Sequence, residues 1–516
     1  MVLTMTRAGI QLSDRAAGVL LHPTSLPGPH GNGDLGHGAF EFARFLAASG
    51  QRFWQMLPVG PIGYGNSPYS AHSTFAGSPL LISPFSLIED GLLDVRALRG
   101  TPRFPEHRVA YPEASAIRDS LLARAFGRRD RAQVAEFAEQ NRAWLDDFAL
   151  FRALKRAHSE VAWTQWPRPL RLREPGALAS ARIDLAEQVE QVHFEQWAFA
   201  RQWSQLRAHC ASLHLALIGD LPLFVAHDSA DVWAHRELFR LNDQGSPVVV
   251  AGVPPDYFSS TGQRWGNPLY DWDAHSRDGY RWWIDRLRTT LDRFDAVRLD
   301  HFIGFERTWE IPASQKTAEQ GQWIPGPRDA LFDALRAALS GSSLPLIAED
   351  LGLVTAEVRA LRERQGFPGL KILQFAFGSD TQAPSFLPHA YSRDCVAYTG
   401  THDNDTSAGW FHERGGEASS RSPAEAERER KLALDYLGTS GAEIHWELIR
   451  EIYKSVASLA IVPAQDLLGL GSEARMNRPG SAEGNWEWRL REGLLTPAIA
   501  TRLAGLVRTY GRGASA

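Results

Sequence analysis

Ionisable side chains stand at the ends of several runs that otherwise have the pattern of buried strands. The stretch "FDAVRLDHFIG" (294–304) passes from apolar residues into Arg298, Asp300 and His301. Residues two apart on a strand point to the same side, so Arg298 and Asp300 are expected to be neighbours. A guanidinium favours the ionised form of a carboxylate beside it, and an ionised carboxylate is what a nucleophile for glycosyl transfer requires. Taken alone, an ion pair that closes the strand end explains the stretch equally well.

Two further apolar runs end in acidic residues. "LIAEDLG" ends in Glu349 and Asp350, and "YTGTHDND" (398–405) carries His402 and Asp403. Glu349 follows its apolar run directly. Partial burial and neighbouring carboxylates would raise its pKa, as a general acid at neutral pH requires. "THDND" by itself also suits a turn with an Asx motif.

A fourth run, "GDLPLFV", adds Asp220, for which a capping or structural role stays open. A metal site is an alternative use of this set, because Asp300, Glu349, Asp403 and His402 are all possible ligands of a divalent ion. Arg298 beside Asp300 would repel a cation. We therefore expect no metal.

These residues need elements that bring them to one place. Short apolar, β-branched runs recur along the chain, each followed by polar or glycine-rich residues and then by a helical pattern: 18–28, 52–61, 215–225, 295–304, 345–352, 370–377, 395–404 and 458–468. Apolar strands alternating with helices indicate a parallel sheet covered on both faces, and eight such units favour a (β/α)₈ TIM barrel. In that fold the chemistry lies at the carboxyl ends of the strands, where these ionisable residues fall.

Uneven spacing between the runs predicts inserted subdomains in this α/β fold. Residues 86–193 have helical periodicity and predict a largely helical insertion between strands 2 and 3. Residues 226–275 are rich in Pro, Gly and aromatic residues and predict a second insertion with an active-site lid loop. The barrel strands then fall in 16–85 (strands 1 and 2), 194–225 (strand 3) and 276–507 (strands 4 to 8).

Composition excludes several classes of function. A net charge of −5 with 22% charged residues and no Lys/Arg-rich run gives no electrostatic reason to expect a nucleic acid or an anionic membrane as partner. The two cysteines, Cys210 and Cys395, exclude a disulfide framework or a thiolate metal cluster and suit a reducing compartment. With no apolar run of signal-peptide or membrane-spanning length, we expect a cytoplasmic protein.

The 17 tryptophans are numerous enough to suggest either a large aromatic core or a cleft that stacks on sugar rings. Trp265, Trp410, Trp486 and Trp488 lie among Gly, Asn and Asp, in loop-like contexts. These four are therefore the candidates for a cleft.

Longer strings around these motifs resemble the bacterial amylomaltases, the 4-α-glucanotransferases or disproportionating enzymes of glycoside hydrolase family 77. The strings run from residue 18 to 490 and are "GVLLHPTSLPG", "YGNSPYS", "GDLPLFVAHDSADVW", "VAGVPPDYFSSTGQRWGNPLYDW", "VRLDHFIGF", "IAEDLG", "YTGTHDNDT" and "LGSEARMNRPGSAEGNWEWRL". The resemblance implies a barrel with inserted subdomains, retaining double displacement on α-1,4-glucans and no cofactor. The implied partners are maltooligosaccharides, starch and glycogen.

The same resemblance implies roles for individual residues. Asp300 matches the nucleophile, Glu349 the general acid/base and Asp403 the transition-state stabiliser. The residues that match contacts to the sugar are Arg298, His301, His402, Asp220, Tyr69, Trp265 and Asn477. Tyr257 and Phe258 belong to the expected aromatic lid, which would exclude water and offer acceptor subsites. Tyr64 and Tyr111 match a possible second glucan site at the surface.

Two other functions remain open at this point. An α-1,4-glucan hydrolase with transfer as a side reaction would use the same three carboxylates. A non-catalytic glucan-binding protein would not need the intact set of Asp300, Glu349 and Asp403.

Overall fold

The computed structural model describes residues 11–255, 261–339, 344–416, 421–481 and 483–513. Within them, parallel strands close into a barrel in the order β1-β12-β11-β10-β9-β6-β3-β2. Its strands are β1 (Ala16–Leu20), β2 (Phe53–Gln55), β3 (Ala216–Leu221), β6 (Ala296–Leu299), β9 (Leu346–Ala348), β10 (Gly369–Ile372), β11 (Cys395–Tyr398) and β12 (Leu459–Pro463). Six of these strands lie within a predicted run, and β1 and β10 overlap one. The predicted (β/α)₈ barrel is confirmed.

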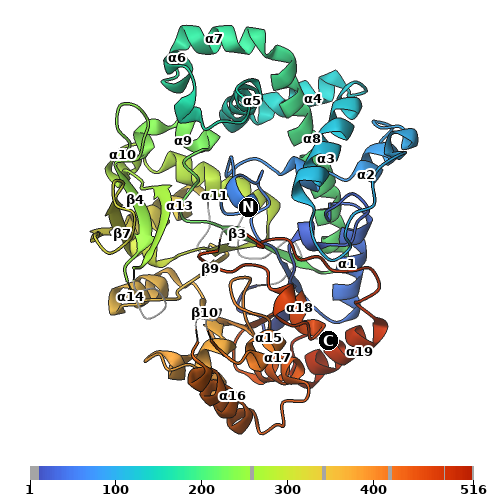
Figure 1. The fold of residues 1–516 in the computed structure, drawn as a ribbon, viewed down its shortest axis with the longest axis vertical. Helices are drawn as coiled ribbons and strands as arrows, with labels where there is room; N and C mark the ends of the chain where they lie inside the picture. Colours follow the sequence, from blue (N-terminus) through green and yellow to red (C-terminus); the bar gives the residue numbers. More distant parts are fainter. Residues whose placement is uncertain (1–10, 256–260, 340–343, 417–420, 482, 514–516) are drawn as a thin grey trace.

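Helices surround this barrel, as Figure 1 shows. Those in or beside the barrel's βα units are α1 (His37–Ala48), α11 (Arg281–Arg293), α13 (Arg328–Leu339), α14 (Ala356–Gln365), α16 (Pro423–Leu437), α17 (Ile444–Lys454) and α19 (Pro497–Thr509). Every residue of β3 and β6 is buried, because helices cover the outside of the barrel and side chains fill its interior. None of the helices in the described residues is both long enough and apolar enough to span a bilayer.

The predicted helical insertion between β2 and β3 is present and lies at the top of Figure 1. Its helices are α2 (Pro84–Glu89), α3 (Tyr111–Phe126), α4 (Arg131–Gln140), α5 (Arg142–Ala157), α6 (Arg168–Arg171), α7 (Pro175–Asp184) and α8 (Ala186–Ser212). Helix α8 runs without a break through the expected boundary at residue 193 and continues toward β3. The insertion is therefore joined to the barrel by a continuous helix.

The insertion also supports the loop that follows β3. Lys155 of α5 is buried and donates to Oδ2 of Asp228 at 2.7 Å. The backbone N–H of Trp163 donates to Oδ1 of the same carboxylate at 3.1 Å. A buried ammonium needs such partners, so this contact ties the helical insertion to a loop at the carboxyl end of the barrel.

A second, antiparallel sheet has the order β5-β4-β7-β8. Strands β4 (Val249–Val253) and β5 (Gln263–Pro268) come from the predicted second insertion, whereas β7 (Arg307–Pro312) and β8 (Gln322–Pro325) follow β6. The range 276–507 therefore holds more than barrel strands. Strand pairing between distant segments produces this sheet, and no local pattern reveals it.

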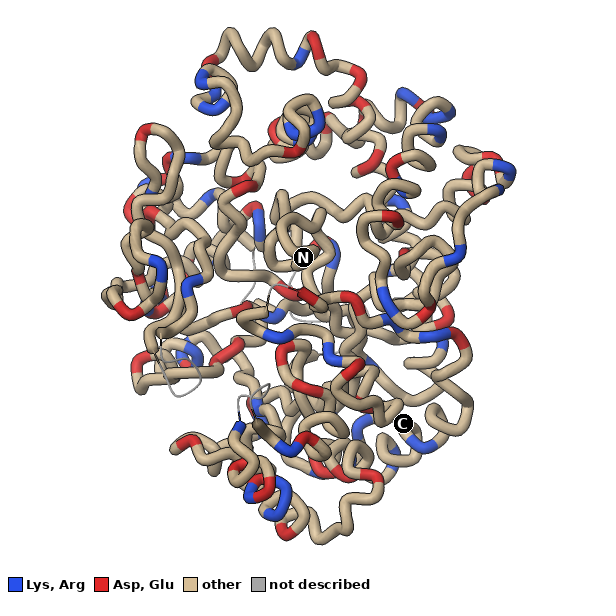
Figure 2. Tube along the Cα trace, viewed as in Figure 1, with Lys and Arg blue, Asp and Glu red and all other residues tan. Residues whose placement is uncertain are grey.

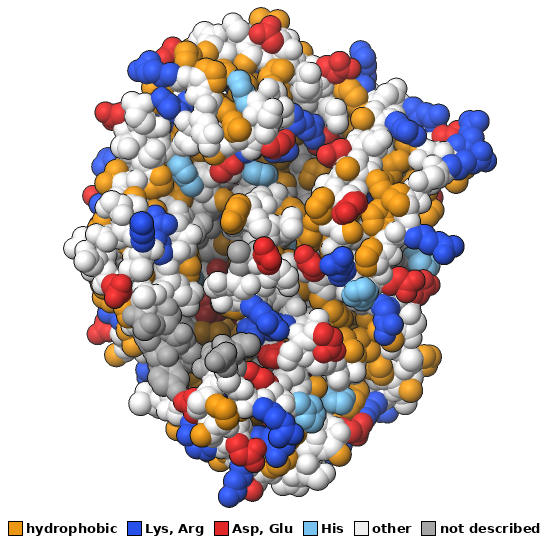
Figure 3. Space-filling model, viewed as in Figure 1, with side chains coloured by type: hydrophobic (Ala, Val, Ile, Leu, Met, Phe, Trp, Pro, Cys, Tyr) orange, Lys and Arg blue, Asp and Glu red, His pale blue; other side chains and the backbone are white. Residues whose placement is uncertain are grey.

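The remaining short helices lie in loops: α9 (Ala230–Ala234), α10 (Trp272–Arg277), α12 (Ile303–Glu306), α15 (Ser407–His412) and α18 (Ala464–Leu467). Acidic and basic residues are interspersed along the Cα trace in Figure 2. Figure 3 shows a hollow on this face of the molecule, with acidic side chains at its floor.

Candidate active site

The end of β6 carries an arginine that binds two carboxylates. Arg298 pairs in register with Asp220 of β3, and its Nη1 donates to both oxygens of Asp220 at 2.8 and 2.7 Å. Its Nη2 lies 3.0 Å from Oδ1 of Asp300. Burial opposes the charge, but Asp220 and Asp300 outweigh that effect and raise the pKa of Arg298. The structure thus places Asp300 beside Arg298, as expected, and adds Asp220 as the second partner of the guanidinium.

Glu349 follows β9 directly and lies on the other side of Arg298, with Oε2 at 3.9 Å from Nη2. Its Oε2 accepts the backbone N–H of His301 at 2.7 Å and its Oε1 accepts that of Leu351 at 3.2 Å. Burial raises the pKa of Glu349 to about 8; Arg298 opposes this rise and the nearby charge of Asp300 adds to it. A carboxyl with this pKa keeps its proton at neutral pH, as a general acid must.

Asp350, the other acidic residue of "AED", points away from this centre. Its Oδ1 accepts the backbone N–H of Leu370 at 2.8 Å, and its Oδ2 lies 3.2 Å from Nε of Arg362. Adjacent residues at a strand end point to opposite sides, which explains the division. Only Glu349 of the pair faces the cluster.

The loop after β11 presents His402 and Asp403. Asn477 donates its side-chain amide to Oδ1 of Asp403 at 2.6 Å, and His402 Nε2 lies 3.3 Å from Oδ2. Arg475 donates to the backbone carbonyl of Asp403 at 2.6 Å. These contacts hold Asp403 from both its side chain and its main chain, although 44% of its side chain is exposed.

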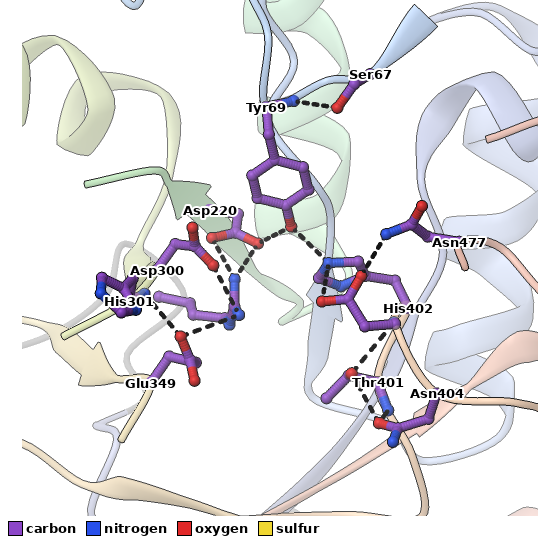
Figure 4. Close-up of polar contacts among 12 residues, drawn as sticks. Ser67, Tyr69, Asp220, Asp300, His301, Glu349, Thr401, His402, Asn404 and Asn477 are labelled. Atoms are coloured by element: carbon purple, nitrogen blue, oxygen red, sulfur yellow. Dashed lines mark hydrogen bonds and ion pairs between the residues drawn. The ribbon is translucent and has the colours of Figure 1, made fainter. Parts of the chain in front are cut away.

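Tyr69 joins the two groups. Its hydroxyl donates to Oδ2 of Asp220 at 2.7 Å and lies 2.9 Å from Nε2 of His402. Because the phenol proton goes to Asp220, Nε2 of His402 must carry the proton of the second bond. Figure 4 shows the resulting chain of polar contacts. Asp300 and Glu349 contact Arg298, which contacts Asp220, and Tyr69 joins Asp220 to His402. His402 in turn contacts Asp403, which accepts from Asn477. The site is one connected network.

Comparison with known proteins identifies the family. A family model described as 4-alpha-glucanotransferase, of glycoside hydrolase family 77, matches residues 21–496. The chain belongs to this family. It is an enzyme, a 4-α-glucanotransferase.

Two of those relatives cover nearly all of both chains. The 4-alpha-glucanotransferase of Thermus thermophilus is 48% identical over 513 residues, which is 96% of this chain and 99% of the relative. The one of Synechocystis sp. is 47% identical over 511 residues, 97% of this chain and 99% of the relative. Among solved structures, an amylomaltase from Streptococcus agalactiae in complex with acarbose superposes with a TM-score of 0.91 at 35% identity, over 97% of this chain and 100% of that one.

His301 occupies an unusual position in this 4-α-glucanotransferase. Its φ is +51°, in the left-handed region that few non-glycine residues adopt. Its ring meets Trp265 of β5 edge to face at a centroid distance of 4.8 Å. Burial lowers the pKa of His301 to about 4, against the opposing effect of Asp300, so the ring is neutral near pH 7. Trp265 is 39% exposed, which leaves part of its indole free to meet a ligand.

The other tryptophans expected to line a cleft are buried. Trp410 lies in α15, and Trp486 and Trp488 pack in the core. Trp486 nevertheless contributes to the site: its ring centroid lies 5.7 Å from that of Tyr69 and 6.0 Å from that of His402. Trp488 lines a pocket together with His402. Of the four, Trp410 is the one buried in a helix, because loop-like composition does not by itself signal exposure.

The predicted second glucan site does not form a shared surface. Tyr64 is 88% exposed, but Tyr111 is only 4% exposed and donates its hydroxyl to the carbonyl of Trp486 at 2.9 Å. Tyr111 therefore cannot offer a ring face to a surface glucan in this structure, whereas the role of Tyr64 stays a prediction. Tyr257 and Phe258 lie outside the described residues.

The alternative of a metal centre finds no support in the geometry of the described residues. Within those ranges no three His, Cys, Asp or Glu side chains are arranged to hold an ion. The guanidinium of Arg298 lies between the carboxylates of Asp220, Asp300 and Glu349. A cation there would be repelled by a permanent positive charge.

Two further groups shape the site, Arg475 and the backbone amide of Leu351. Arg475 lies in the fragment "SEARMNRPG", and nothing in that fragment distinguishes it from a surface arginine.

Proposed function

We propose that this enzyme transfers a segment of an α-1,4-glucan to the 4-hydroxyl of an acceptor glucan or glucose by a retaining double displacement. The observation that carries the proposal is the shared contact of Asp300 and Glu349 with Nη2 of Arg298, at 3.0 and 3.9 Å. Two carboxyl groups that both contact one nitrogen atom are close to each other. This favours the separation of about 5 to 5.5 Å between carboxyl groups in retaining enzymes over the wider separation in inverting enzymes.

The two carboxyl groups suit different tasks. Glu349 is protonated at neutral pH and donates its proton to the glycosidic oxygen of the donor. Asp300, paired with Arg298, attacks the anomeric carbon, so that the C–O bond to the leaving glucan breaks as the bond to Asp300 forms. The product is a covalent glycosyl-enzyme and a shortened glucan.

The second displacement reverses these roles. Glu349, now ionised, removes the proton of the 4-hydroxyl of an incoming glucan, and that oxygen displaces Asp300 from the anomeric carbon. Two inversions restore the α configuration and both residues return to their starting states. Water in place of the acceptor would give hydrolysis, so the expected lid around Trp265 is where we propose that water is excluded.

Asp403, His402 and Arg298 complete the proposal as groups that stabilise the transition state and hold the sugar. Asn477 orients Asp403, and Tyr69 orients His402 by their mutual hydrogen bond. Groups held in place before the reaction stabilise developing charge without reorganising, which is the main source of their effect. The substrates that we propose are maltooligosaccharides, starch and glycogen, in keeping with the names of the relatives.

Incubation with maltotriose tests transfer against its alternatives. A ladder of shorter and longer maltooligosaccharides with glucose, and little rise in reducing ends, is the expected result. A large rise in reducing ends would establish a hydrolase instead, and unchanged maltotriose would leave only binding.

The general acid is tested by Glu349→Gln, which keeps the shape of the side chain and removes the transferable proton. We expect turnover of maltotriose to fall by about a hundredfold or more. Glu357→Gln on the exposed face of α14 is the matched control and should keep full turnover. Near-normal rates in Glu349→Gln would disprove the assignment.

A further inference from the structure

Three hydrogen bonds join Glu349 to the segment of residues 299–302. The N–H of Glu349 donates to the carbonyl of Leu299, and the N–H of Phe302 donates to the carbonyl of Glu349, each at 3.0 Å. Between them, the N–H of His301 donates to the side-chain Oε2 of Glu349 at 2.7 Å. The residues that directly follow Asp300 therefore set the position of Glu349.

The left-handed backbone of His301 makes this arrangement possible. Its φ is +51°, and the next residue, Phe302, is right-handed with φ −56° and ψ −28°. Successive residues of opposite hand turn their N–H groups toward the same side, forming a concavity that binds an anion. Here the N–H groups of residues 301 and 302 both point to Glu349, one to its carboxyl group and one to its carbonyl.

Several other groups face the carboxyl group of Glu349. Arg298 lies 3.9 Å away and is itself paired with Asp300 and Asp220, and Leu351 donates to the other oxygen. Asp350 faces Arg362 on the opposite side of the strand end. The N–H of His301 makes the shortest of the polar contacts that the described residues make with this carboxyl.

We propose that residue 301 is a positioning residue, whose left-handed backbone directs its N–H at Oε2 of Glu349, fixes the orientation of the carboxyl group and favours release of its proton. The proposal rests on the proposed function of Glu349 as general acid and base. Burial strengthens the hold of Glu349 on its proton, and a donor aimed at the ionised oxygen offsets part of that effect. Glu349 must release and regain a proton in each cycle. It therefore needs both the burial that favours its protonated form and the donor that favours its ionised form.

The side chain of His301 does a separate task. It packs edge to face on Trp265 and lies at a ring distance of 6.2 Å from Phe224, away from Glu349's oxygen contact. Substitutions can therefore remove the imidazole while keeping or disturbing the backbone conformation. Asparagine and glycine adopt the left-handed region readily, whereas a β-branched valine is strongly disfavoured there.

The experiment compares His301→Asn with His301→Val, both of which lack the imidazole. Relative to the asparagine variant, we expect valine to lower kcat on maltotriose by about tenfold or more with a similar KM, because the directed N–H is lost. We also expect the alkaline limb of its pH–rate profile to move to higher pH by up to about one unit. The limb moves upward because the first step needs protonated Glu349. Loss of a donor to the ionised carboxylate raises the pKa of Glu349, so the protonated form persists to higher pH. His301→Gly should follow the asparagine variant.

A matched control exists at the other end of the barrel. His214 is an exposed histidine with φ +57°, between α8 and β3 and outside the site. His214→Val carries the same conformational conflict, so it should lower Tm relative to His214→Asn while leaving the pH–rate profile unchanged. If His301→Val does not fold, His301→Ala replaces it, since alanine also disfavours the left-handed region but less severely.

Equal kcat and equal pH profiles in folded His301→Asn and His301→Val, or Ala, would overturn the proposal. A similar profile shift in His214→Val would overturn it too, because the effect would then be a general loss of stability. Failure of the proposed function is distinguishable: it appears as full activity in Glu349→Gln, whatever the variants at residue 301 do.

Discussion

The two sides of the active site differ in how far the side chains of Glu349 and Asp403 are exposed to solvent. On the β6–β9 side, Glu349 is 12% exposed and contacts two backbone amides. On the β11 side, Asp403 is 44% exposed and contacts Asn477 and His402. Burial disfavours a negative charge, so the environment of Glu349 suits a carboxyl that carries a proton. Residues of nearly the same chemistry thus acquire different tasks from their surroundings.

Tyr69 is the bridge between these sides. Its hydroxyl contacts Asp220, the partner of Arg298, and His402, the neighbour of Asp403. The loop that carries Tyr69 follows β2, so the connection comes from a part of the chain far from either strand. We therefore expect three effects of decreasing size, from removing the exposed carboxylate of Asp403, the hydroxyl of Tyr69 and the buried carboxyl of Glu349.

The largest effect is expected from Asp403→Asn. The variant keeps the size of the side chain but removes the negative charge, so we expect kcat on maltotriose to fall by about a hundred- to a thousandfold. Because this side chain is half-exposed, Tm should change little. Asp435→Asn on exposed α16 is the control. A large Tm change in Asp403→Asn would contradict the contrast between an open and a buried side.

A smaller effect is expected from Tyr69→Phe. It removes the hydroxyl that joins Asp220 to His402, and we expect kcat to fall about tenfold through loss of orientation. Tm should also fall, because two buried groups lose a partner. Steady-state rates on maltotriose and thermal melts, with Tyr510→Phe as control, measure both. Unchanged kcat would show that the two sides work independently.

The smallest effect concerns stability and its dependence on pH. Folding raises the pKa of Glu349 from 4.5 to about 8, so the folded protein keeps a proton that the unfolded chain loses. The stability of the wild-type protein therefore falls as pH rises from about 4.5 to 8 through this group. Glu349→Gln removes that penalty and should raise Tm by about a few degrees at pH 8 relative to wild type, and by little at pH 4.5. An equal Tm difference at both pH values would contradict the burial of a protonated carboxyl.

Much of the fold was predictable from local patterns. The eight apolar runs predict the eight barrel strands, because strands buried on both faces must be almost continuously apolar. The helical insertion follows from its periodicity. The antiparallel sheet was not predictable, since β7 and β8 lie beyond β6 in the chain, and β7 pairs with the distant β4 only in the folded protein.

For the candidate site, a change from apolar to charged residues is a local signal, so the residues at strand ends, among them Asp300, Glu349 and Asp403, were predictable. Their neighbours depend on the folded barrel. Asp220 is the main partner of Arg298 because β3 and β6 pair in that register, and Trp486 is buried because Tyr69 and His402 lie against it. The left-handed turn at His301 leaves no mark in the sequence, since its cost is met by hydrogen bonds to a different strand. Register, burial and backbone hand depend on contacts between distant segments, and those exist only after the barrel closes.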